Sequence, residues 1–116
     1  MKEIFKDILA IDGVSGILLF SHQGRVVFQE LVLPLSENPE RRDWKSLTTV
    51  IKDMNEVDFI YENSRIYIRN STAGHLLVLM ELFTSIAMVR LSCDMALPVL
   101  NKKDNGSRGI MSFFKW

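Results

Sequence analysis

One segment limits the folds open to this 116-residue chain more than any other. Residues 75–82 read His-Leu-Leu-Val-Leu-Met-Glu-Leu, an almost unbroken apolar run. A strand with apolar side chains on both of its faces has to be covered on both. The run is far shorter than the roughly 20 residues that a membrane span requires. We therefore expect residues 75–82 to form the central strand of a sheet enclosed between two layers.

The composition of the chain argues against several classes of protein. Fourteen Lys and Arg balance fourteen Asp and Glu, whereas proteins that bind nucleic acid usually show a clear basic excess. The single cysteine, Cys93, has no partner for an internal disulfide, which fits a reducing cytosol. The first residues mix acids with bases, unlike a secretory signal. We expect a cytoplasmic protein with no nucleic-acid partner and no integral membrane segment.

Hydrophobic periodicity divides the chain into helices and strands, separated by Gly, Pro and polar turns. Asn63 and Ser64 suit a two-residue hairpin turn. Thr84 or Ser85 is a suitable N-cap for the last helix, which Pro98 should end or kink. The expected elements are a helix over 2–11, strands over 14–20 and 25–33, a helix over 40–55, strands over 57–62, 65–69 and 75–82, and a helix from about residue 84.

Four motifs follow one another along the chain. The first helix ends in Ile-Asp-Gly-Val-Ser-Gly at residues 11–16, hairpins follow at 20–27 and 61–68, and an apolar strand at 76–80 leads directly into a helix. In this order the motifs resemble the roadblock family, small domains related to dynein light chains and to a bacterial polarity protein that acts on a Ras-like GTPase. The resemblance covers residues 1–100. We therefore expect a roadblock-like domain over 1–100 and a flexible C-terminal tail over 101–116.

The resemblance implies an α+β fold of the roadblock/profilin type. Its five-stranded antiparallel sheet would carry one helix on one face and the two terminal helices on the other, in the order helix, strand, strand, helix, three strands, helix. Family members typically dimerise through the second helix and the edge strand after it. The sequence agrees in one respect, because the strand at 57–62 has no Pro or Lys to protect an open edge.

A homodimer of this type would use the second helix and the strand that follows it. The apolar residues of the helix recur at the spacing of a narrow stripe, which would be shared between the core and the interface. The residues expected at the dimer interface are Trp44, Leu47, Ile51, Met54, Val57, Phe59 and Tyr61.

Two further groups of residues are candidates for binding a partner. A basic cluster begins the second helix, near which the resemblance places the GTPase partner, and such a cluster would speed association with an acidic surface. Aromatic side chains of the kind that dominate interface energetics lie near residue 116. The alternatives are a solvated helix face for the first group and packing onto the same domain for the second. The candidates are Arg41, Arg42, Lys45, Phe113, Phe114 and Trp116.

The sequence shows no motif for catalysis, for a cofactor or for a metal ion. His22, His75 and Cys93 lack the spacing of a nucleophilic triad or of a zinc site. None of the glycines begins a Gly-x4-Gly-Lys-Ser/Thr phosphate loop. We therefore expect a protein that is not an enzyme, with no catalytic, cofactor-binding or metal-binding residues.

Three functions are consistent with these observations. The resemblance favours a homodimer that binds a small Ras-like GTPase in a prokaryotic cytosol, as an activator or as a scaffold. The second is a structural adaptor whose binding does not depend on a nucleotide. The third is a ligand sensor of the PAS or GAF type, against which the dense apolar strand at 76–80 argues because it leaves little room for a pocket.

Overall fold

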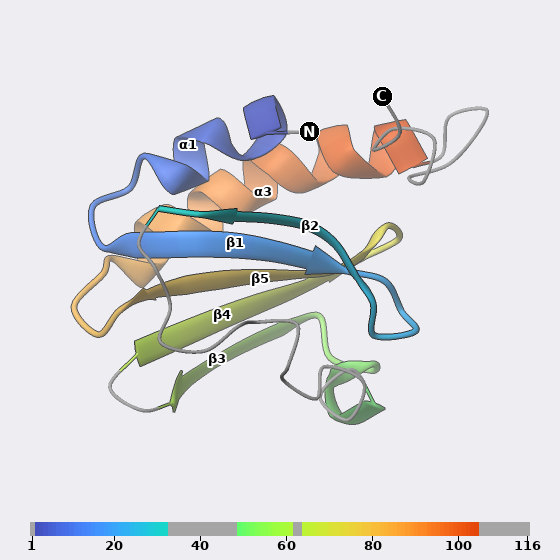
Figure 1. Ribbon diagram of the computed structural model, residues 1–116, viewed down its shortest axis with the longest axis horizontal. Helices are drawn as coiled ribbons and strands as arrows, with labels where there is room; N and C mark the ends of the chain where they lie inside the picture. Colours follow the sequence, from blue (N-terminus) through green and yellow to red (C-terminus); the bar gives the residue numbers. More distant parts are fainter. Residues whose placement is uncertain (1, 33–48, 62–63, 105–116) are drawn as a thin grey trace.

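The protein folds as a five-stranded antiparallel sheet with helices packed against it (Figure 1). The structure, a computed structural model, describes residues 2–32, 49–61 and 64–104. The strand order is β2-β1-β5-β4-β3, and the α+β fold predicted from the sequence is confirmed. The elements are the 3₁₀ turn η1 (Lys2–Phe5), α1 (Lys6–Leu9), β1 (Val14–Phe20), β2 (Val26–Leu31), β3 (Glu56–Tyr61), β4 (Ser64–Ser71), β5 (Gly74–Glu81) and α3 (Ile86–Asp104).

The central strand is β5, as its composition predicts. It lies between β1 and β4, and every residue from Gly74 to Met80 is buried. Leu77 is paired with Leu18 on one side and with Ile68 on the other. Apolar contacts therefore surround β5 on both faces, and the ladder hydrogen bonds join it to a strand at each edge.

Each face of the sheet has its own apolar core, because alternate strand residues point to opposite faces. Figure 1 shows α1 and α3 together over one face, where residues such as Phe5 and Val89 pack against Leu76 and other strand residues. On the other face Ile51 is buried in a second cluster. That cluster contains Leu18, Phe20, Ile51, Ile66, Ile68, Leu77 and Leu79.

Only the end of the expected second helix falls within the described residues. Residues 49–51 are helical, but residues 52–55 are not, so the helix ends before the predicted boundary at Asn55. The N–H of Met54 donates to the carbonyl of Ile51 at 2.9 Å, and the side chain of Asn70 donates to the carbonyl of Lys52 at 3.1 Å. These bonds satisfy carbonyls that a longer helix would have used.

Helix α3 begins as predicted but does not end at Pro98. The hydroxyl of Ser85 accepts a hydrogen bond from the N–H of Met88 at 3.3 Å, as an N-cap does. The helix continues to Asp104 with Pro98 on its exposed side. Burial of Leu97 and Leu100 holds it against the sheet on both sides of the proline. Residues 101–104 are therefore helical, and the division into a domain over 1–100 and a tail over 101–116 stays a prediction.

The turn between β3 and β4 lies one residue earlier than expected. Tyr61 is paired with Ser64, so Ser64 is a strand residue and positions 62 and 63 connect the strands. Moving a two-residue connection by one position shifts the cross-strand partners by two residues and leaves each side chain on its own face of the sheet. The observed register places Ile66 and Ile68 in the buried cluster around Ile51.

Candidate functional site

The strand β3 forms one edge of the sheet, with β4 on one side and no described strand on the other. Just before β3, the carbonyl of Asn55 accepts a hydrogen bond from the N–H of Asn70 at 3.0 Å. Antiparallel ladder bonds alternate along a strand, so the backbone groups of Asp58 and Ile60 point away from β4. The outer edge of β3 therefore presents donors and acceptors that a further strand could bind.

Five of the residues predicted for a dimer interface fall within the described ranges: Ile51, Met54, Val57, Phe59 and Tyr61. Val57 and Phe59 pack against the cluster that contains Ile51, which is itself only 3% exposed. Met54 is 46% exposed just before β3, and Tyr61 is the last residue of the strand. Ile51 is thus a core residue of the single chain, and use of these residues in an interface stays a prediction. Trp44 and Leu47 lie outside the described residues.

The residues predicted to bind a partner are not placed by the structure. All of them fall between the described ranges or after residue 104, and their roles stay predictions. They are Arg41, Arg42, Lys45, Phe113, Phe114 and Trp116.

A polar network joins β3 to α3 on the face that the helices cover. Arg90 donates two hydrogen bonds to the carboxylate of Glu56, from Nε at 2.8 Å and from Nη2 at 3.3 Å. The hydroxyl of Tyr67 donates to the same carboxylate. Nη1 of Arg69 donates to the Tyr67 hydroxyl at 3.2 Å and to the carboxylate of Asp94 at 2.7 Å. Charged side chains of β3, β4 and α3 thus fix the edge strand to the helix.

The protonation states of this network follow from its contacts. Hydrogen bonds from Arg90 and Tyr67 lower the pKa of the Glu56 carboxyl. Burial and the hydrogen bond to Glu56 raise the pKa of Tyr67 to about 12. At neutral pH Glu56 is therefore an ionised acceptor and Tyr67 a protonated donor, as both hydrogen bonds require.

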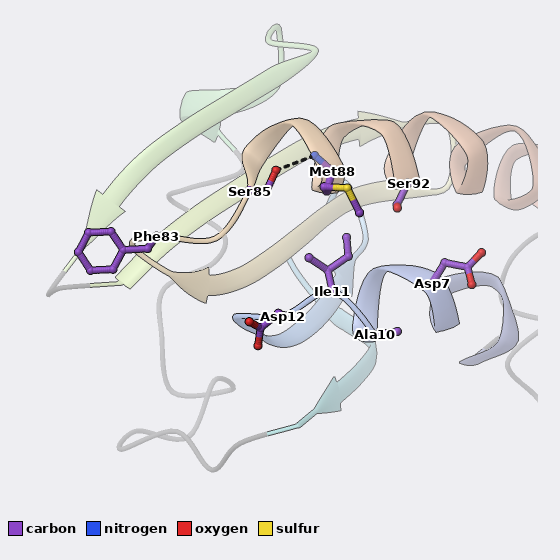
Figure 2. Close-up of a pocket in the computed structure, with 8 residues that line it drawn as sticks. All are labelled: Asp7, Ala10, Ile11, Asp12, Phe83, Ser85, Met88 and Ser92. Atoms are coloured by element: carbon purple, nitrogen blue, oxygen red, sulfur yellow. Dashed lines mark hydrogen bonds between the residues drawn. The ribbon is translucent and has the colours of Figure 1, made fainter.

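An open groove of about 660 Å³ lies between the end of α1 and the start of α3 (Figure 2). Figure 2 shows the side chains of Ile11 and Met88 pointing toward one another across it. Phe83, at its margin, is 96% exposed. Among the described residues, two carboxylates line the groove and no Lys or Arg does. Its lining residues are Asp7, Ala10, Ile11, Asp12, Phe83, Ser85, Met88 and Ser92.

Helix α3 has a second apolar side, which continues from this groove. Its core side buries Val89, Cys93, Ala96, Leu97 and Leu100. Exposed apolar residues recur at spacings of three and four, which places them on one side of a helix. We call these residues the outer stripe of α3: Met88, Leu91, Met95 and Val99. Hydrophobic periodicity along the sequence did not separate the two sides, because both contribute apolar residues to the same helix.

The cysteine and the two histidines considered for a nucleophilic site all lie within the described residues. Burial raises the pKa of the Cys93 thiol to about 12, so it carries almost no nucleophilic thiolate. His75 is 1% exposed, and its ring contacts that of His22 with centroids 5.0 Å apart. Within the described ranges no group of three or more His, Cys, Asp and Glu could hold a metal ion. No helix in these ranges is long and apolar enough to cross a membrane.

Solved structures share the fold of this chain, although no family model and no curated protein matches its sequence. The gliding protein MglB of Thermus thermophilus has a TM-score of 0.64 and 16% identity, over 86% of this chain and 84% of that one. MglB of Myxococcus xanthus has a TM-score of 0.65 and 14% identity, over 86% and 80%. A Roadblock/LC7 domain of Streptomyces avermitilis has a TM-score of 0.63 and 12% identity, over 88% and 92%. The predicted roadblock-like fold, related to that of MglB, is confirmed.

Proposed function

We propose that this chain, with its roadblock-like fold, is a cytoplasmic homodimer that binds and regulates a small Ras-like GTPase without being an enzyme itself. The fold carries the proposal, because two of the structures that share it are of MglB, and the one from Thermus thermophilus is described as a gliding protein. The resemblance found in the sequence motifs implies the GTPase partner. The regulation would take the form of activation or of scaffolding.

The open edge of β3 supports the homodimer. An exposed edge strand with alternating apolar residues favours pairing with another chain, and two copies joined edge to edge would form a continuous sheet. Val57 and Phe59 would then lie next to the same residues of the second copy. Met54 and the residues of the second helix would cover the junction from one face.

The backbone direction of β3 gives a direct test of this dimer. Ile60→Pro removes an N–H that points away from β4 and leaves the β3–β4 ladder intact. The Ile60 side chain is 67% exposed, so its loss costs little burial. Light scattering on the purified full chain should give a dimer mass for the wild type and for Ile60→Thr, but a monomer mass for Ile60→Pro. A dimer mass for Ile60→Pro would reject pairing through this edge.

The basic cluster of Arg41, Arg42 and Lys45 is the proposed contact for the GTPase, with the aromatic residues near residue 116 as a second contact. Immobilised full-length protein would be incubated with lysate of the source cells, with GDP or with a non-hydrolysable GTP analogue. Recovery of a small GTPase only with the analogue would support the regulator. Equal recovery of other proteins in both samples, without a GTPase, would support the structural adaptor instead.

A charge-reversal variant tests the contact residues themselves. The triple variant Arg41→Glu, Arg42→Glu and Lys45→Glu should lose the GTPase, because it replaces attraction with repulsion at an acidic partner surface. The matched control reverses the same number of charges elsewhere, at Lys2, Lys6 and Lys102. Loss of binding in both variants, or in neither, would remove the basic cluster from the proposed site.

A further inference from the structure

The outer stripe of α3 and the groove next to it form one continuous apolar surface. Met88 belongs to both, since it lines the groove and begins the stripe. The surface extends from Phe83, 96% exposed, past Met95, 67% exposed, to Val99. No described residue covers it, although apolar surface of this extent usually marks a binding site.

The same chain contains an apolar segment of matching composition. Residues 110–116 read Ile-Met-Ser-Phe-Phe-Lys-Trp, in which only the serine and the lysine are polar. They are linked to the end of α3 by residues 105–109, Asn-Gly-Ser-Arg-Gly, a composition typical of a turn. We propose that residues 110–116 bind along the outer stripe of α3 of the same chain and end at the groove beside α1.

The length of the chain after α3 fits this path. Met88 precedes Asp104 by a distance along the helix of about 24 Å at 1.5 Å per residue. Residues 105–116 span up to about 40 Å when extended. After a turn over 105–109, the remaining seven residues reach about 23 Å, enough to follow a stripe about 17 Å long.

The charges of the segment and of the groove are complementary. Asp7 and Asp12 line the groove, and neither carboxylate makes a hydrogen bond or an ion pair within the described part of the chain. An antiparallel path along α3 would bring Lys115 to this end of the stripe. Carboxylates beside an apolar groove favour an occupant with apolar and basic residues, and residues 110–116 have this composition.

Covalent linkage favours residues 110–116 over a separate protein as the segment that binds the outer stripe of α3. A segment joined to its binding surface by a short turn is present at an effective concentration in the millimolar range. In the free protein the aromatic residues would therefore lie on α3. A partner that binds them would first displace them from the stripe.

Methionine methyl groups give a direct test in the full-length chain. Met88 and Met95 lie on the stripe, whereas Met80 is buried in the core and Met54 lies at the β3 edge. With ¹³C-labelled methionine methyls, the full-chain variant Phe113→Ser and Phe114→Ser should shift the Met88 and Met95 signals, because two aromatic rings no longer lie against them. The Met54 and Met80 signals should keep their positions.

A control variant and a contrary result complete the methionine test. Ser112→Ala changes the same segment without removing a ring, so it should leave the Met88 and Met95 signals unchanged. Unchanged Met88 and Met95 signals in the double phenylalanine variant would overturn the proposal. The variants Met88→Leu and Met95→Leu assign the two signals by their disappearance.

A disulfide test decides whether the segment binds its own chain. In the pair Leu91→Cys and Phe114→Cys, mild oxidation should form a bond within one chain, so that the denatured protein runs at the monomer mass and retains one alkylatable thiol, that of Cys93. The pair Asp53→Cys and Phe114→Cys should form none and retain three thiols, because Asp53 lies at the end of the helical turn over the other sheet face. Three free thiols in the first pair would overturn the proposal. A linked band at twice the mass for the first pair would assign the stripe to a second copy and reject this proposal. Neither readout depends on a GTPase or on the β3 edge.

Discussion

The strands β5 and β3 belong to one sheet but serve it in different ways. β5 is paired on both sides, and its residues from Gly74 to Met80 are buried. β3 is paired on one side, and its side chains alternate between the cluster around Ile51 and a polar network under α3. The difference teaches that β5 is held by burial and by pairing on both sides, whereas β3 is held by β4, by packing on one face and by an ion pair to α3, and no described strand pairs with its outer backbone groups.

The largest expected effect comes from a cavity in β5. Leu77 is fully buried, and Leu77→Ala should lower the free energy of unfolding by about 2–5 kcal/mol. Ile60→Ala on β3 should cost no more than about 0.5 kcal/mol, since its side chain is largely exposed. Urea unfolding of both variants measures the contrast. Similar losses at the two positions would contradict the assigned roles of centre and edge.

A smaller effect is expected where β3 is fixed to α3. Tyr67→Phe removes the hydroxyl that joins Glu56 to Arg69, while Arg90 and Asp94 keep their ion pairs with these residues. The expected loss is about 1 kcal/mol in the urea unfolding free energy, the typical net value of a hydrogen bond. An unchanged unfolding midpoint would mean that the Tyr67 hydroxyl adds no stability beyond that of the two ion pairs.

The smallest effect is a dependence on pH that differs between the two strands. Burial and the nearby His22 lower the pKa of His75 in β5, so the unfolded chain binds the proton more readily than the folded one. Stability from this residue is therefore complete above about pH 6.5 and is lost as the pH falls through the lowered pKa. The lowered pKa of Glu56 in β3 acts in the same direction, but only below about pH 4.5.

Urea unfolding at a series of pH values separates the two contributions. His75→Gln should flatten the loss of stability below pH 6.5 and leave the loss below pH 4.5. Glu56→Gln should flatten the loss of stability below pH 4.5 and leave the loss below pH 6.5. A wild-type stability that stays constant between pH 7 and pH 5 would show that His75 is protonated equally in the folded and unfolded chains.

The sequence predicted the features that depend on short runs of neighbouring residues. The apolar run at 75–82 identified the central strand, and the residues at 57–62 predicted a strand whose place at the edge came from the roadblock resemblance. The N-cap at Ser85 was also predicted, because a local hydrogen bond determines it. These features follow from residues that are close in the sequence.

The remaining features depend on contacts between distant residues. Glu56 and Arg90 are joined only because the sheet brings β3 beneath α3. The helix continues past Pro98 because Leu97 and Leu100 are buried against the sheet. Periodicity gave no means of finding the groove, since it requires the relative placement of α1 and α3.

The burial of Cys93 makes the only thiol of the chain a natural probe of internal motion. Its side chain lies between α3 and the sheet and is fully inaccessible to reagents in the folded chain. Alkylation of Cys93 therefore requires α3 to separate from the sheet, or the chain to unfold. The rate of that reaction, compared with the rate for a free thiol, reports the free energy of the opening that exposes Cys93, local or global, without any substitution in the protein.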